Sequence, residues 1–122
     1  GSAIHPHLHL IFPTANSLVS RWKMEYAIYP LLGQGPAYGN SAYTTLGVLS
    51  VPNPNLASRS TIAEWPSPIT MTGQLGSCTV LWRVSRLAAS DVLDTDTSMI
   101  VLSEFDIHYE IDKLGSPEEI PV

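Results

Sequence analysis

Apolar and polar residues alternate along much of this chain, and the alternation has a period of two. The segment 21–29 is the clearest case. Its even-numbered positions hold the apolar residues and its odd-numbered positions include the charged ones: Trp22, Met24, Tyr26 and Ile28 against Arg21, Lys23 and Glu25. Because successive side chains of a β-strand point to opposite faces of the sheet, this pattern predicts a half-buried strand. Ten prolines and eight glycines separate such runs, as is typical of all-β proteins.

Seven strands are predicted on this basis. Their expected ranges are Ile4–Phe12, Arg21–Tyr29, Ala42–Val51, Ser58–Trp65, Ile69–Thr72, Ser77–Leu87 and Met99–Ile111. The apolar face of the last strand is expected to comprise Met99, Val101, Phe105, Ile107, Tyr109 and Ile111. No helix of useful length is indicated, since the Ser, Thr and Pro content of the loops disfavours one. The sequence therefore predicts an all-β fold, an antiparallel, jelly-roll-like β-sandwich, with a small barrel as the alternative.

The composition indicates one small domain that associates with copies of itself. A length of 122 residues suits a single domain. Gly1 and Ser2 are interpreted as a cloning scar, so the β-sandwich domain is expected to span residues 3–122. The missing initiator methionine indicates that the chain is a piece of a longer protein. Only 14% of the residues are charged, against ~25% in typical soluble domains, and we therefore expect an oligomer.

Charge and cysteine content exclude several classes of function. The net charge of −5 and the scattered Lys and Arg residues argue against nucleic-acid binding. Cys78 is the only cysteine, which excludes an intrachain disulfide and a cysteine-based zinc site. No apolar run approaches the ~20 residues of a membrane-spanning helix. The start of the chain also lacks the basic and apolar regions of a signal peptide, so no membrane insertion is expected.

Three of the four histidines lie in the segment HPHLHL, at positions 5, 7 and 9. In a strand, His5, His7 and His9 share one face, with neighbouring β-carbons ~7 Å apart. Two such imidazoles can converge on one cation, but a single chain then supplies only two ligands. Three copies around a threefold axis would supply six nitrogens. The alternative is a polar face, exposed or at an interface, that is hydrogen-bonded to a neighbouring strand.

Acidic residues alternate along the last predicted strand and surround the fourth histidine. This acidic ladder consists of Glu104, Asp106, His108, Glu110 and Asp112. Like charges on one strand face repel each other, and pairing with His5, His7 and His9, or with Arg21 and Lys23, would relieve the repulsion. A His–Asp pair also resembles part of a hydrolase triad. No G-x-S-x-G sequence accompanies it, and Cys78 falls on a predicted core strand, so we expect no enzyme.

Two loop features are weaker candidates for binding sites. Asp91, Asp94 and Asp96 alternate in the segment DVLDTDTS, as calcium ligands can, but the EF-hand pattern is absent and a solvated loop is the favoured interpretation. Aromatic residues near loops are candidates for stacking on sugars: Tyr29, Tyr38, Tyr43 and Trp65. The alternative is that these rings cap the ends of the core.

The two ends of the chain together resemble a family of tailed-bacteriophage virion proteins. That family has a Pro-His-x-His strand, a Trp-x-x-x-Tyr strand and a final Phe-Asp-x-His-Tyr-x-x-Asp-x-x-Gly-Ser-x-x-Glu stretch. The matching positions here are Pro6, His7, His9, Trp22, Tyr26, Phe105, Asp106, His108, Tyr109, Asp112, Gly115, Ser116 and Glu119. His5 is not required by the pattern, and Leu10 stands where tryptophan is expected.

The resemblance implies a structural β-sandwich module in a phage particle, at the C-terminal end of a tail fibre or tailspike. Such a module would be a homotrimer that drives assembly, binds host-surface polysaccharide, or does both. Its implied place is the virion, assembled in the bacterial cytoplasm among other virion proteins. Trimeric phage fibres use His-x-His pairs to hold a metal on their axis, which implies Fe, Zn or Ni at His7 and His9, with His5 as a further candidate.

Two other functions remain open. The first is a capsid decoration or head-fibre protein that stabilises the shell. The second is a glycan hydrolase or esterase that uses the acidic ladder. Glycan hydrolysis needs two carboxylates ~5–9.5 Å apart across a cleft, whereas Glu104, Asp106 and Glu110 lie along a single strand face.

Overall fold

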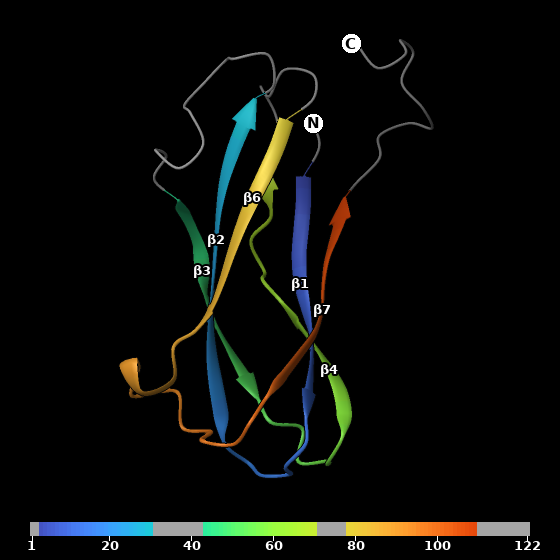
Figure 1. The fold of residues 1–122 in the computed structure, drawn as a ribbon, viewed down its shortest axis with the longest axis vertical. Coiled ribbons are helices and arrows are strands. Elements are labelled where there is room, and N and C mark those ends of the chain that lie inside the picture. Colours follow the sequence, from blue (N-terminus) through green and yellow to red (C-terminus); the bar gives the residue numbers. More distant parts are fainter. Residues whose placement is uncertain (1–2, 31–42, 71–77, 110–122) are drawn as a thin grey trace.

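The computed structural model describes residues 3–30, 43–70 and 78–109, and it confirms the predicted all-β fold as two antiparallel sheets packed into a sandwich (Figure 1). The strands are β1 (Ala3–Phe12), β2 (Val19–Pro30), β3 (Thr44–Pro52), β4 (Arg59–Glu64), β5 (Ile69–Thr70), β6 (Cys78–Arg86) and β7 (Val101–Tyr109). A 3-10 turn, Ala88–Ser90, follows β6. Within the described residues, no helix is long and apolar enough to span a membrane.

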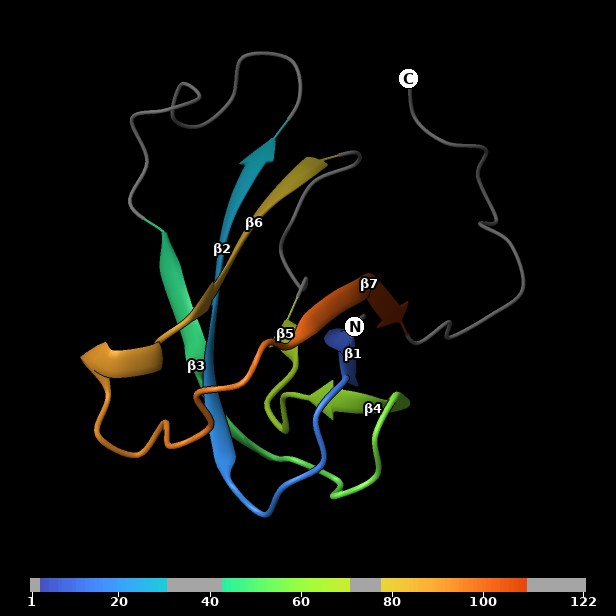
Figure 2. The same ribbon diagram turned by 60° about the horizontal axis from the view of Figure 1, so that its bottom comes forward.

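Each sheet is built around one long central strand. In the first, which we call the β1 sheet, β1 pairs with β4 and β5 along one edge and with β7 along the other. In the second, the β2 sheet, β2 lies between β3 and β6. Figure 2 separates the two layers, with β2, β3 and β6 on one side and β1, β4 and β7 on the other. The chain crosses between the layers several times, so distant segments become neighbours.

Even-numbered residues of both central strands form most of the core between the two sheets, with Val51, Ala63 and Trp65 added from other segments. Leu8, Leu10 and Phe12 of β1 are completely buried, and they pack with Trp22 and Met24 of β2. Because side chains alternate along a strand, the odd-numbered residues of β1 lie on the outer face of the sandwich. The alternation that the sequence displays therefore places His5, His7 and His9 on one outer surface.

The charged face of β2 is not fully exposed to solvent, although the alternating pattern of the strand predicts an exposed polar face. Glu25 is only 6% exposed, because Arg83 of β6 binds both of its carboxylate oxygens, at 2.9 and 2.8 Å. Lys23 approaches the same carboxylate at 3.8 Å, and the ring of Tyr43 lies against the Arg83 guanidinium. The hydrogen bonds from Arg83 lower the pKa of Glu25. The outer face of the β2 sheet thus carries an ion-pair group in which Arg83 and Lys23 share the carboxylate of Glu25.

The prediction that Met99 and Val101 belong to the apolar face of the last strand is wrong. Met99 precedes β7 and is 69% exposed, and Val101 is 38% exposed. The cause is a bulge: the β1–β7 register shifts at His9, which leaves Ser103 of β7 as the extra residue. An extra residue reverses the inside–outside alternation beyond it. Ile100 packs against the core in their place.

Candidate metal centre

The pairing of β1 with β7 brings the acidic ladder to the histidines. The directly opposed pairs are His5 with His108, His7 with Asp106, and His9 with Glu104. Opposed residues of an antiparallel pair point to the same face with β-carbons ~4.5–5.5 Å apart. Of the two pairings that the sequence left open for the ladder, the structure has the one with the histidines. Glu110 and Asp112 lie outside the described residues.

Asp106 is at the centre of the resulting cluster. Its Oδ2 lies 3.1 Å from the Nε2 of His7 and 3.2 Å from the Nε2 of His9. Its other oxygen, Oδ1, lies 3.6 Å from the Nε2 of His108. The His7 ring also contacts the rings of His9 and His108, with centroids 5.2 and 4.4 Å away. Three imidazoles from two strands therefore surround a single carboxylate.

The environment of Asp106 keeps its carboxyl group ionised. Partial burial by itself would raise the pKa of Asp106. The hydrogen bond to His9 and the charges that His7 and His108 carry when protonated outweigh this effect, and the pKa is lowered. A carboxylate that remains negative over the neutral pH range can accept hydrogen bonds or bind a cation.

His7, His9 and Asp106 could hold a metal ion. Each offers one ligand atom, and these atoms all lie within 4.8 Å of one another. From the sequence, each chain is expected to supply two metal ligands, both histidines. The tertiary structure adds Asp106 as the third. Two imidazoles and one carboxylate are a common ligand set for Zn²⁺ and Fe²⁺. His5 lies on the same face but is not one of the three grouped residues, and Glu104 is exposed beside them.

The aromatic candidates do not assemble into a sugar-binding platform in the described part of the chain. Trp65 is 2% exposed, and its Nε1 donates a hydrogen bond to the Gly47 carbonyl at 3.0 Å. The prediction of an exposed stacking surface at Trp65 is therefore wrong, because the ring is part of the core. Tyr29 is likewise buried, and Tyr43 packs against Arg83. Tyr38 lies outside the described residues.

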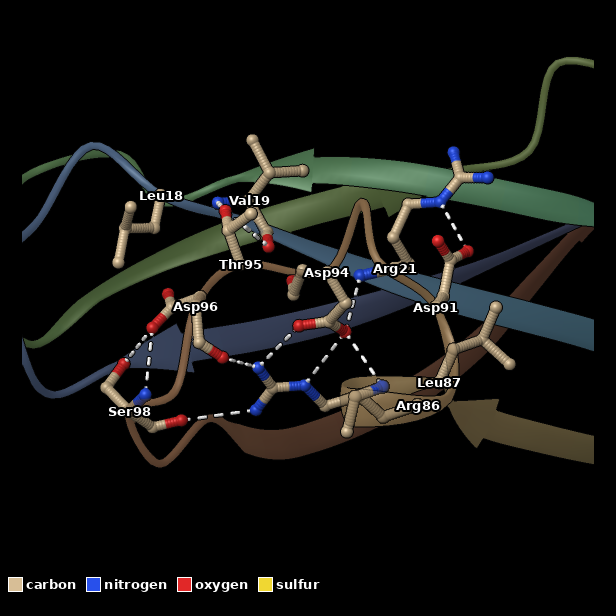
Figure 3. A network of polar contacts seen from close by, with 12 residues as sticks. Leu18, Val19, Arg21, Arg86, Leu87, Asp91, Asp94, Thr95, Asp96 and Ser98 are labelled. Carbon is tan, nitrogen blue, oxygen red and sulfur yellow. Dashed lines mark hydrogen bonds and ion pairs between the residues drawn. The ribbon is translucent and has the colours of Figure 1, made fainter.

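The loop aspartates bind protein groups, and the expectation that they are solvated is wrong for two of the three (Figure 3). The Asp94 side chain is 1% exposed, and it accepts hydrogen bonds from the backbone N–H of Arg21 and from the Arg86 guanidinium. Asp96 is 2% exposed and binds Ser98 and two asparagines, Asn16 and Asn53. Asp91, half-buried, pairs with Arg21 at 3.0 Å. We call this group the aspartate clasp.

Sequence reasoning missed the partners of the clasp, because Asn16 and Asn53 lie in separate turns with no shared motif. The sequence pattern identifies the acidic ladder, but the alignment of the ladder with the histidines depends on the register between two strands about 97 positions apart. Comparisons with known proteins add no assignment: no family model, no curated protein and no solved structure gives a significant match to this chain.

Proposed function

We propose that this chain is a non-enzymatic bacteriophage virion module, a homotrimer at the end of a tail fibre or tailspike that mediates assembly and attachment to host-surface glycans. The motifs of the first and last strands support the phage assignment by resemblance. The observation that carries the proposal is the histidine–aspartate cluster at the centre of an outer sheet face, where three copies could meet.

The outer face of the β1 sheet is better suited to a trimer interface than the outer face of the β2 sheet. On the β1 sheet, Ile62 lies opposite His9 and Val101 lies opposite Ile11. Ile62 is 58% exposed and Val101 is 38% exposed. This face therefore combines aliphatic side chains, which are inexpensive to remove from water, with the histidines and with the carboxylates of Asp106 and the exposed Glu104. The outer face of the β2 sheet carries the ion pairs of Glu25 with Arg83 and Lys23, which are costly to desolvate.

A transition-metal ion such as Fe, Zn or Ni belongs to this proposal. Imidazole and carboxylate ligands suit all three metals, and a metal at the outer face would stabilise the strand pair that forms the interface. One ion shared on a threefold axis requires one metal per three chains. An ion held within each protomer requires three metals per trimer.

Light scattering coupled to size-exclusion chromatography tests the oligomer. We expect a trimer at micromolar concentration, and Ile62→Asp should shift it to monomer by placing a charge in the interface. Val48→Asp is the matched control, because Val48 is 39% exposed on the outer face of the β2 sheet, opposite Lys23. A monomeric wild-type protein would overturn the trimer.

Binding assays test the place of the module in the virion. Labelled protein is expected to bind to a glycan array or to whole host cells. Binding to capsids instead would favour the decoration protein. Glycan cleavage that is lost in Asp106→Asn would overturn the non-enzymatic assignment.

A further inference from the structure

We infer that each protomer binds its own divalent transition-metal ion through His7, His9 and Asp106, and that His108 supplies the fourth ligand. The inference deepens the proposed function, on which it rests for the role of the metal in a virion module. It differs in stoichiometry and in ligand set from an ion shared on a threefold axis.

The spacing of the ligand atoms supports a site within one chain. Metal–nitrogen and metal–oxygen bonds of about 2.0–2.2 Å place tetrahedral ligand atoms ~3.4 Å apart and octahedral neighbours ~3.0 Å apart. The Nε2 atoms of His7 and His9 lie 3.1 and 3.2 Å from Oδ2 of Asp106, between these two values. With all three ligand atoms within 4.8 Å of one another, side-chain adjustments without any movement of the strands would let the three residues share an ion.

The direction of the imidazoles also favours one ion per chain. A shared axial ion would require the Nε2 atoms of His7 and His9 to point away from the protomer. Here both Nε2 atoms converge on the same oxygen of their own chain, and His7 is only 4% exposed. A buried imidazole that faces a carboxylate on the neighbouring strand is placed to bind an ion between those strands.

The backbone holds this geometry rigidly. His7 and Asp106 are directly opposed in the β1–β7 ladder, and pairing continues from Ile4 to Ile11 along β1. The bulge at Ser103 lies beside the site, and the Ser103 hydroxyl donates a hydrogen bond to the His9 carbonyl at 3.0 Å. Bulges commonly re-aim side chains next to functional sites. The ligands are thus presented by paired strands, as a preorganised metal site requires.

His108 is not one of the three grouped residues, but it contacts both Asp106 and His7, and a rotation of its side chain would complete the coordination sphere. Its Nε2 lies 3.6 Å from Oδ1 of Asp106, and its ring contacts the His7 ring edge-on. The side chain is 69% exposed, so it can rotate towards the ion without displacing packed neighbours. Four protein ligands would close the site, as in structural zinc centres, whereas catalytic centres keep one position for water. A closed site agrees with a non-enzymatic module.

Such a metal centre would link β1, the first strand of the domain, to β7, the last. A ligand that binds only the folded protein stabilises it by mass action, and these ligands come together only in the folded protein. The β1–β7 pair is one edge of the proposed trimer face, so the ion would also hold that face in shape.

Metal titration of untagged protein tests the inference. The protein is stripped with EDTA, dialysed and loaded with Zn²⁺ or Co²⁺, and bound metal is measured by elemental analysis beside light scattering. We expect one ion per chain and the intense visible absorption of tetrahedral Co²⁺. One ion per three chains, or none, would overturn the inference.

Three variants identify the ligands. Asp106→Asn keeps the shape of the side chain but should weaken metal binding by at least ~100-fold, since even outer-shell partners contribute roughly 10- to 100-fold. His108→Ala should weaken binding and convert the Co²⁺ spectrum to the weak absorption of a solvated site. An unchanged spectrum would exclude His108 as a ligand. His5→Ala, on the same face, is the control and should bind metal normally, with circular dichroism confirming that each variant folds.

The outcomes separate this inference from the proposed function. A trimer that binds no metal would overturn the metal centre and the metal part of the proposed function, and would leave the trimeric virion module intact. A monomer that binds one ion would support the centre and overturn the trimer.

Discussion

The aspartate clasp and the histidine cluster around Asp106 are both built on aspartate side chains, but these side chains bind different kinds of partner. In the clasp, the carboxylates of Asp94 and Asp96 are buried, and guanidinium, amide, hydroxyl and backbone N–H groups bind their oxygens. In the cluster, Asp106 is bound by imidazoles, which can give up a proton and become ligands. In the clasp, protein hydrogen-bond donors already occupy the carboxylate oxygens, whereas the imidazoles of the cluster are themselves possible metal ligands.

The difference shows why a count of acidic residues is a poor guide to cation sites. The clasp loop holds three aspartates within six positions, yet protein groups already bind all three: arginines bind Asp91 and Asp94, and serine and asparagine side chains bind Asp96. The single aspartate of the cluster faces groups that are metal ligands themselves. The identity of the partners, not the density of acids, decides whether a cation can bind.

Removal of the buried carboxylate of the clasp should have the largest effect on stability. Asp94→Ala leaves Arg86 without its ion-pair partner and the backbone N–H groups of Arg21 and Ala88 without an acceptor. We expect a loss of about 2–4 kcal/mol in the free energy of unfolding, measured by urea denaturation. Metal affinity of the remaining folded protein should be unchanged, and a parallel loss of metal binding would show that the two sites are coupled.

Metal should stabilise the protein through the cluster and not through the clasp. At a free Zn²⁺ concentration of one hundred times the dissociation constant, mass action adds about 2.7 kcal/mol, which thermal denaturation would detect as a higher Tm. Asp106→Asn should abolish the increase. If Zn²⁺ raises the Tm of wild type and Asp106→Asn equally, the ion binds elsewhere.

Acid should weaken the clasp. Burial by itself would raise the pKa values of Asp94 and Asp96, but the hydrogen bonds from Arg86 to Asp94 and from Ser98 to Asp96 outweigh it and lower both. The folded protein therefore binds fewer protons than the unfolded chain, whose aspartates titrate near ~3.9. Stability from these groups is present above that pH and is lost as the pH falls through the lower folded pKa values.

The corresponding measurement is the Tm of metal-free protein as a function of pH. The wild type should lose stability steeply below about pH 4, and Asp94→Asn, which cannot titrate at this position, should show a shallower decline. Equal slopes for the two proteins would mean that Asp94 does not contribute to acid unfolding.

A substitution at the bulge beside the cluster should have the smallest effect on the free energy of unfolding. Ser103→Ala removes one exposed hydrogen bond, from the Ser103 hydroxyl to the His9 carbonyl, and we expect a loss of about 0.5 kcal/mol in urea denaturation. A modest decrease in Zn²⁺ affinity should accompany it if the bulge orients His9. Unchanged affinity would mean that the ladder alone positions the ligand.

Much of the fold follows from residue patterns that act locally. The alternation of 4–12 and 21–29 predicts both central strands and their buried faces, because neighbouring side chains of a strand must point in opposite directions. The same argument fails at Met99 and Val101, since one extra residue at Ser103 reverses the alternation and local patterning does not reveal it. The expectation of an exposed aromatic ring fails at Trp65, which ends a predicted strand and is buried in the core.

The sequence by itself determined that His5, His7 and His9 share a face and that Glu104, Asp106 and His108 share another. Only the tertiary structure decided that these faces are one surface, with Asp106 between His7 and His9. The physical reason is that a period of two specifies the side of a strand but not its partner or its register. Those depend on packing between segments about 97 residues apart, and the candidate metal centre exists only where they meet.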